Sequence, residues 1–251
     1  MLLYTVFKNF WQNVCGLIYP HQCLRCKKDL LSQSKKSCLC QACQEAISFN
    51  RPPFCSNCSR FLNGAVGKTL CPECEKNHYH FDRTWGTTIY NETMKELLHL
   101  FKYCNKTALQ YPFSKLICSF LENYGVDLKP FDWVVPVPLH STRLRERGFN
   151  QSELLASHIS SHYQIPLLNK NLQRLRHTPN QARLKKKERW TNIRGAFKIV
   201  NSSLFKNSSV VLVDDLFTTG ATVSEAARTL KEAGARRVEI VTLAIAYLED
   251  L

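Results

Sequence analysis

The sequence has no apolar stretch of the about 20 residues that a helix needs to cross a bilayer. Its N-terminal stretch, residues 1–18, also lacks a basic start and a cleavage site of small residues. These absences argue against a membrane span and against a secretory signal peptide, and they predict a cytoplasmic protein. Apolar residues recur in this stretch at three- and four-residue steps, so we expect an amphipathic helix over residues 1–20. The sequence leaves open whether this helix docks on the rest of the protein or on a partner.

Acidic residues are scarce as well. The chain has 20 Asp and Glu against 34 Lys and Arg, which gives a formal net charge of +14 at pH 7. The positive excess predicts an anionic partner, either phosphates or nucleic acid, and does not distinguish between them.

Cysteine, in contrast, is abundant and regularly spaced. Eight of the twelve cysteines form four Cys-x-x-Cys pairs, and without a signal peptide this pattern favours metal over disulfides. Gaps of 13 and 12 residues within the two halves suit two structural zinc sites that fold residues 21–80. The sequence leaves open whether neighbouring Cys-x-x-Cys pairs share a zinc ion or whether the pairs interleave as a cross-brace. The two halves of residues 21–80 resemble each other, which suggests an internal duplication. The predicted ligands are Cys23, Cys26, Cys40, Cys43, Cys55, Cys58, Cys71 and Cys74.

Residues 81–251 contain no Cys-x-x-Cys pair and alternate short apolar runs with helical patterns. Such alternation predicts an α/β domain in which helices cover both faces of a mostly parallel sheet. We expect strands near 83–90, 133–137, 210–213 and 238–244, and helices near 94–101, 115–124, 151–162 and 223–233.

The most informative string is VVLVDDLFTTGATV at residues 210–223. An apolar strand ends in Asp214 and Asp215, at the end where open α/β sheets bind ligands. A loop of small residues then opens a helix, and its N–H groups suit a phosphate, while the two carboxylates can accept hydrogen bonds from sugar hydroxyls. The string predicts a sugar-phosphate site with a phosphate loop of Thr218, Thr219, Gly220, Ala221 and Thr222.

This string resembles the signature of phosphoribosyltransferases, in which two acidic residues bind the ribose and the next loop binds the 5-phosphate of phosphoribosyl pyrophosphate (PRPP). Three further strings, VPVPLH at 135–140, RGFNQ at 147–151 and NIRGAF at 192–197, are similar to those of the ComF competence family. The resemblance covers nearly the whole chain. It implies a type I phosphoribosyltransferase-like sheet preceded by a double zinc-ribbon module, with boundaries at 1–20, 21–80 and 81–251.

The resemblance also implies ligands for the basic residues. Arg143, Arg145 and Arg147 follow the strand at 133–137, in what we expect to be a loop before a helix that begins near residue 150. In phosphoribosyltransferases the corresponding loop holds pyrophosphate, and the planar forks of Arg143 and Arg147 suit that role. Lys102 matches a recurring lysine of the family and is assigned to the phosphates. Mg²⁺ is implied because it neutralises the leaving pyrophosphate.

A second basic segment, residues 174–198, contains nine Lys and Arg against one Glu. Three interpretations stay open: a lid over the site, a surface that contacts nucleic acid, and a solvated loop. The candidates for the lid or the nucleic-acid contact are Arg183, Lys185, Lys186, Lys187 and Arg189.

The ComF resemblance implies a role in natural transformation, in which single-stranded DNA is taken up on the cytoplasmic side and competence-machinery proteins are partners. The alternative is an active phosphoribosyltransferase that acts on a small-molecule acceptor in nucleotide metabolism. A domain that binds its nucleotide ligand without turnover is a third hypothesis. The sequence shows no residue set that would identify an acceptor, so it does not decide whether the chain is an enzyme.

Overall fold

The structure is a computed structural model that describes residues 22–30, 37–62, 67–176 and 186–247. The helix predicted over residues 1–20 lies outside these ranges, as do Arg183 and Lys185 of the basic segment. Within the described part of the chain, no helix combines the length and the apolar character that a membrane span requires.

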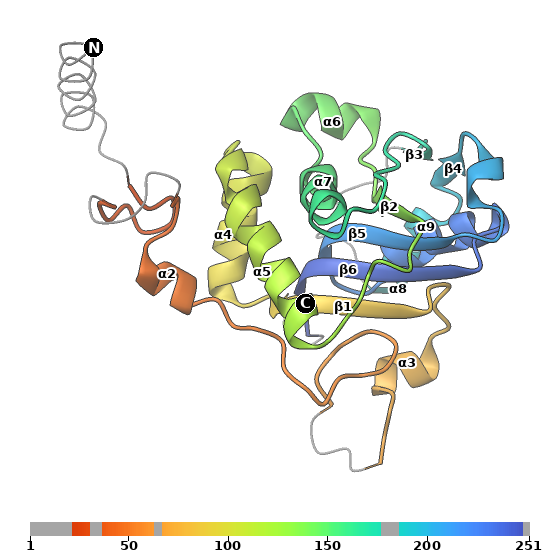
Figure 1. Ribbon diagram of the computed structural model, residues 1–251, viewed down its shortest axis with the longest axis horizontal. Helices are drawn as coiled ribbons and strands as arrows, with labels where there is room; N and C mark the ends of the chain where they lie inside the picture. Colours follow the sequence, from red (N-terminus) through yellow and green to blue (C-terminus); the bar gives the residue numbers. More distant parts are fainter. Residues whose placement is uncertain (1–21, 31–36, 63–66, 177–185, 248–251) are drawn as a thin grey trace.

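A parallel sheet of four strands forms the centre of the molecule, in the order β1-β6-β5-β2 (Figure 1). The strands are β1 (Arg83–Ile89), β2 (Trp133–Pro136), β5 (Ser209–Phe217) and β6 (Arg237–Ile245). All four predicted strands are confirmed. The strand β5 is longer than predicted, because its pairing with β6 continues past the two aspartates to Phe217, opposite Ile245. Both aspartates therefore belong to the strand.

Helices cover both faces of this sheet, as predicted. Successive residues of β5 point to opposite faces, so Val211 and Val213 join one buried cluster while Val210 and Leu212 join the other. The first cluster is covered by α4 (Glu92–Tyr103), α5 (Gln110–Asn123) and α7 (Gln151–Tyr163), and the second by α9 (Ala221–Glu232), on which α8 (Lys186–Ile193) packs. Figure 1 shows α4, α5 and α7 together on one side of the strands.

Two elements near the carboxyl ends of the strands were not predicted. One is the helix α6 (Ser141–Arg147), which carries the three arginines that we expected in a loop. The His140 side chain accepts a hydrogen bond from the Thr142 N–H at its start, and Gly148 ends it with a positive φ of 82°. The loop prediction was wrong because α6 buries no residue and so has no apolar periodicity to reveal it.

The second is a small antiparallel sheet of β3 (Leu172–Arg174) and β4 (Phe197–Ile199). A bridge between His140 and Arg174 joins β3 to the start of α6. The basic segment is therefore not one continuous loop: its described ends form β3, α8 and β4.

The two halves of the Cys-rich segment, residues 21–80, pack on opposite faces of the sheet. The first half of the segment, which includes α2 (Gln41–Glu45), contributes Leu30, Leu39 and Ile47 to the cluster beneath α4 and α5. Its second half, which includes α3 (Pro72–Lys76), contributes Leu62 to the cluster on the opposite face of the sheet. The two halves of the segment are thus attached to two different cores. The domain boundaries inferred from the family resemblance stay a prediction.

Candidate functional site

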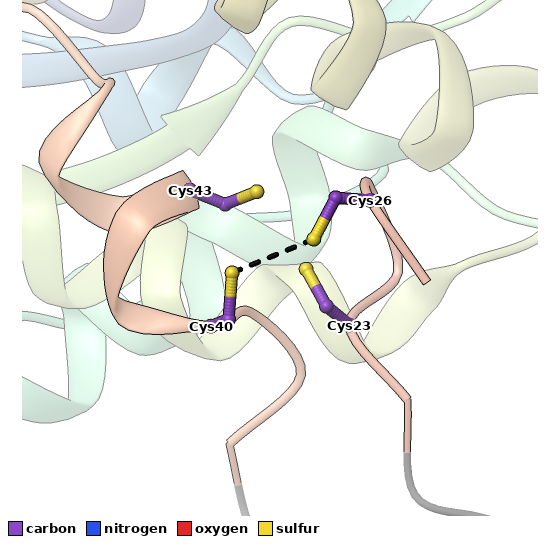
Figure 2. Close-up of side chains that lie close together, drawn as sticks. All are labelled: Cys23, Cys26, Cys40 and Cys43. Carbon is purple, nitrogen blue, oxygen red and sulfur yellow. Dashed lines mark hydrogen bonds between the residues drawn. The ribbon is translucent and has the colours of Figure 1, made fainter. Parts of the chain in front are cut away.

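The eight paired cysteines form two separate clusters of four. The first holds Cys23, Cys26, Cys40 and Cys43 (Figure 2), and the second Cys55, Cys58, Cys71 and Cys74. Within each cluster all Sγ atoms lie within 4.8 Å of one another, and one Sγ pair in each is 3.5 Å apart. A tetrahedral zinc with bonds of about 2.3 Å requires Sγ separations of about 3.8 Å. Both clusters therefore fit a structural zinc ion, with the sequential pairing and without the cross-brace.

The two clusters are built by the same local structure. The first pair of each lies on a tight turn whose fifth residue has a positive φ of 64°, at Lys27 and at Ser59. The second pair lies at the start of a short helix, with Cys40 and Cys71 as the residues that precede α2 and α3. This repeated geometry supports the predicted duplication.

A pocket opens at the carboxyl ends of β5 and β2, where parallel sheets bind ligands. It collects charged residues from four elements. Asp214 and Asp215 come from β5, and Lys102 from the last turn of α4. The predicted residues that line it are Lys102, Arg143, Arg147, Asp214, Asp215 and Thr222.

The two aspartates have different partners. The Lys102 Nζ lies 2.8 Å from the Asp215 Oδ2, and both side chains are largely buried. The Asp214 Oδ1 accepts hydrogen bonds from the Ser152 hydroxyl at 2.9 Å and from the Asp215 N–H at 3.0 Å. Burial of the carboxyl group, and next the charge of Asp215, raise the pKa of Asp214 to about 7, although Lys102 opposes the shift. At neutral pH this site therefore holds a carboxylate of unusually high proton affinity.

Arginines give the pocket a positive excess. Burial, and next the charge of Arg143, lower the pKa of Arg174 to about 10. Burial also lowers the pKa of Arg147, whose guanidinium lies 5.0 Å from the centre of the Tyr103 ring. Three arginines and Lys102 outnumber the two aspartates, so the pocket favours an anion. Arg145 is exposed on α6 and does not line the pocket.

The predicted phosphate loop connects β5 to α9. Thr219 and Ala221 are buried, and Gly220 has a positive φ of 79°. A Cβ at Gly220 would lie 2.7 Å from the rings of both Phe217 and Tyr79, so only glycine fits here. The helix α9 begins at Ala221, and its first N–H groups lack acceptors within the helix. Of the five loop residues, Thr222 lines the pocket, while the others form the turn.

Four pocket residues with polar side chains were not among the predicted site residues: Tyr103, Gln151, Ser152 and Arg174. Arg174 belongs to the basic segment and was not predicted to be a site residue, and its place in β3 brings it to the pocket. Ser152 could not be found from the sequence, because its role depends on the contact between the start of α7 and β5.

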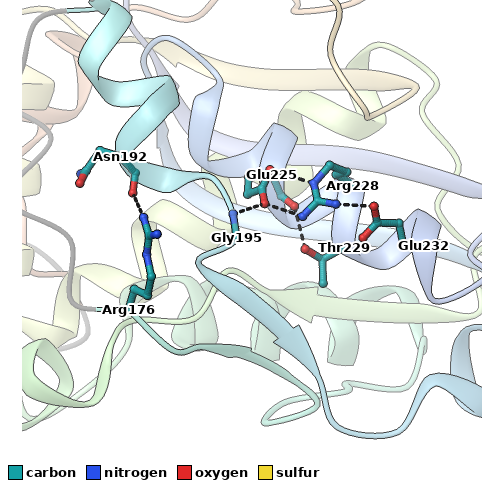
Figure 3. Close-up of polar contacts among 7 residues, drawn as sticks. All are labelled: Arg176, Asn192, Gly195, Glu225, Arg228, Thr229 and Glu232. Atoms are coloured by element: carbon teal, nitrogen blue, oxygen red, sulfur yellow. Dashed lines mark hydrogen bonds and ion pairs between the residues drawn. The ribbon is translucent and has the colours of Figure 1, made fainter.

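The two described parts of the basic segment contact each other, and the second also contacts α9 (Figure 3). The Arg176 Nη2 donates to the Asn192 carbonyl at 2.7 Å, and the Gly195 N–H donates to the Glu225 carboxylate at 2.7 Å. Burial would raise the pKa of Glu225, but the hydrogen bond from Arg228 lowers it. Among the five lid candidates, Lys186 and Lys187 belong to α8, and Arg189 is 6% exposed.

Comparisons with known proteins agree with this geometry. A family model described as phosphoribosyl transferase domain matches residues 151–247, which include Asp214, Asp215 and the phosphate loop. Competence protein F of Haemophilus influenzae is 31% identical over 230 residues, which cover 90% of this chain and 97% of that protein. DNA utilization protein YhgH of Escherichia coli K12 is 29% identical and covers 80% of this chain and 94% of its own. Competence protein ComFC of Streptococcus pneumoniae is 29% identical, with coverages of 85% and 90%.

Proposed function

Because this chain belongs to the ComF family of competence proteins, we propose that it binds PRPP with Mg²⁺ and takes part in the uptake of DNA during natural transformation. The fold is that of a type I phosphoribosyltransferase, preceded by a module with two four-cysteine clusters. The observation that carries the proposal is the pocket in which an acidic pair faces three arginines and a lysine.

Each part of PRPP has a complementary group in this proposal. Asp214 and Asp215 accept hydrogen bonds from the two ribose hydroxyls. The N–H groups of the loop from Thr218 to Thr222 bind the 5-phosphate at the start of α9. Arg143 and Arg147 hold the pyrophosphate with their planar forks, and Lys102 lies beside them. When bound, Mg²⁺ neutralises charge on the pyrophosphate.

Calorimetric titration of PRPP with Mg²⁺ tests this assignment. We expect the zinc-containing wild type to bind, and the double variant Asp214→Asn/Asp215→Asn to bind at least about 100-fold more weakly. Each lost hydrogen bond to a charged acceptor is worth about 1.5 to 3 kcal/mol, and every 1.4 kcal/mol is about tenfold in affinity. A folded wild type with two zinc ions that does not bind PRPP would contradict the proposal.

The second part of the proposal is contact with single-stranded DNA on the cytoplasmic side. The names of the relatives, which refer to competence and DNA utilization, and the net charge of +14 support it. The contact residues that we propose are the basic candidates Arg183, Lys185, Lys186 and Lys187, without Arg189, which is buried. Competence-machinery proteins are the proposed protein partners.

The affinity for a single-stranded oligonucleotide should fall steeply with salt. About four phosphate contacts on a single strand predict a loss of about 50-fold between 50 and 200 mM salt. Replacing the four proposed contact residues by alanine should reduce this slope, which fluorescence anisotropy at several salt concentrations measures. An absence of binding at 50 mM salt would refute a direct DNA contact.

An active transferase is the second candidate function, and one observation favours it. A recess beside the pocket shares Pro138, Leu139 and Arg174 with it, so an acceptor held there would lie next to a bound sugar phosphate. Release of pyrophosphate from PRPP on addition of an acceptor would distinguish this function from binding alone.

A further inference from the structure

Arg60 connects the second cysteine cluster to the phosphate loop. Its side chain is 4% exposed, and each of its three nitrogens has a partner. Nη1 donates to the Cys58 Sγ at 3.8 Å, Nε donates to the Ala246 carbonyl at 3.0 Å, and Nη2 donates to the Thr218 carbonyl. One guanidinium thus contacts a predicted zinc ligand at one end and the first residue of the loop at the other.

Tyr79, five residues after the last cysteine of the same cluster, contacts the next residue of the loop. Its hydroxyl donates to the Thr219 carbonyl at 3.1 Å. Its ring packs against Phe81 and Trp190, and it closes the space beside Gly220. The loop is therefore held from outside at two consecutive carbonyls, both by residues of the second cysteine module or its flank.

These two contacts determine where the N–H groups of the loop point. In a planar trans peptide the C=O and the next N–H point in opposite directions. Because Arg60 fixes the Thr218 carbonyl, it also orients the Thr219 N–H, and Tyr79 orients the Gly220 N–H in the same way. Both N–H groups belong to the loop to which we assign the 5-phosphate.

The first cysteine module has the same turn but not this connection. In each module the N–H of the first cysteine donates to the carbonyl five residues later: Cys23 to Lys28, and Cys55 to Arg60. Lys28 and Arg60 are therefore equivalent positions of the duplicated turn. Lys28 is exposed, whereas Arg60 is buried against the loop.

We propose that Arg60 is a positioning residue, through which the metal-bound second cluster holds the phosphate loop in the form that binds a sugar 5-phosphate. Four thiolates around Zn²⁺ carry a net charge of about −2, which offsets the cost of burying the guanidinium. Loss of this metal removes the counter-charge and frees the side chain from the loop. The inference rests on the proposed function, since it requires the loop to bind the 5-phosphate.

The test uses the two ends of PRPP as separate probes, ribose 5-phosphate for the loop and pyrophosphate for the arginines. Arg60→Ala should bind ribose 5-phosphate about tenfold more weakly or worse, since it loses the charged hydrogen bond that holds the Thr218 carbonyl of the loop. Its affinity for pyrophosphate should stay within about twofold of the wild type. Lys28→Ala is the matched control and should leave both affinities unchanged. Equal loss for both probes, or no loss, would overturn the role of Arg60.

Hydrogen exchange gives a readout that does not depend on a ligand. The amides of Thr219 and Gly220 should exchange faster in Arg60→Ala than in Lys28→Ala, and equal rates would contradict the proposal. Wild type that binds neither PRPP nor ribose 5-phosphate would instead contradict the proposed function, so the two failures are distinguishable.

The metal can be removed from one cluster at a time. Cys71→Ser/Cys74→Ser and Cys40→Ser/Cys43→Ser should each reduce the zinc content to one ion per chain. Only the first variant should lose affinity for ribose 5-phosphate, by about tenfold or more. Similar affinities in the two variants would overturn the link between the second metal and the loop. If the second-cluster variant does not fold, Arg60→Ala, which keeps all eight cysteines, still decides the proposal.

Discussion

Replacing both Arg143 and Arg147 by alanine should weaken the binding of PRPP with Mg²⁺ by at least about 100-fold. Both guanidinium groups line the pocket, and each hydrogen bond from an arginine to a phosphate oxygen is worth about 1.5 to 3 kcal/mol. The loss should be accompanied by little change in stability, because α6 buries none of its residues. Titration calorimetry together with thermal unfolding measures both quantities.

Arg145→Ala provides the matched control for this experiment. Arg145 lies on the same helix and carries the same charge, but it is exposed and does not line the pocket. Its removal should change PRPP affinity by less than about threefold, through the long-range field alone. If Arg145→Ala and the double variant lose similar affinity, the arginines act as general surface charge, and the assignment of Arg143 and Arg147 to the pyrophosphate is wrong.

Asp214→Asn should make the folded protein more stable at pH 8. The pKa of Asp214 is raised from its ordinary value of 3.8 to about 7, so above pH 7 the folded state must keep an unfavourable charge that the unfolded state solvates freely. Between these two pKa values the folded state binds more protons, and stability therefore falls as pH rises. The amide of Asn removes this penalty, and its Oδ1 can still accept from Ser152 and from the Asp215 N–H.

We expect a gain of at least about 1 kcal/mol in the free energy of unfolding at pH 8. The difference in the free energy of unfolding between variant and wild type should be smaller at pH 5.5, because there the wild-type carboxyl group is already protonated in the folded state. Urea unfolding of both proteins at the two pH values measures this, and pH 5.5 serves as the lower limit because acid displaces zinc from thiolates. A variant that is less stable than wild type at pH 8 would show that the charge of Asp214 does not destabilise the folded state.

The same substitution should weaken PRPP binding, since an amide offers the ribose hydroxyls one acceptor oxygen in place of two. A residue that lowers stability while it supports binding is the pattern expected of a functional site. The acidic pair in a buried strand is thus difficult to explain as a structural feature of the sheet alone.

Much of this architecture could be predicted from local patterns in the sequence. The strands of the sheet are apolar runs, and the two clusters follow from Cys-x-x-Cys spacing, since both signals depend on neighbours in the chain. Asp214 and Asp215 were placed correctly at the carboxyl end of the sheet because a strand and a turn of small residues enclose them.

The parts that could not be predicted depend on contacts between distant segments or on elements without an apolar face. The helix α6 is short and has no fully buried residue, so no apolar periodicity in the sequence marks it. Arg174 reaches the pocket because β3 pairs with β4 and bridges to His140. Arg60 appears in the sequence as one basic residue among 34, and its contact with Thr218 spans 158 positions of the chain.

The pocket also has a consequence for how the chain holds together. Its lining comes from six separate elements, which extend from Lys102 on α4 to Thr222 on α9 and include α6, α7, β3 and β5. A ligand that contacts all of these elements would constrain the chain segments between them, as a cross-link does, and would stabilise the folded state. Occupancy of the pocket therefore depends on the folding of about half of the chain, residues 102–222, and a ligand supplied by the cell would act as a reversible cross-link between these elements.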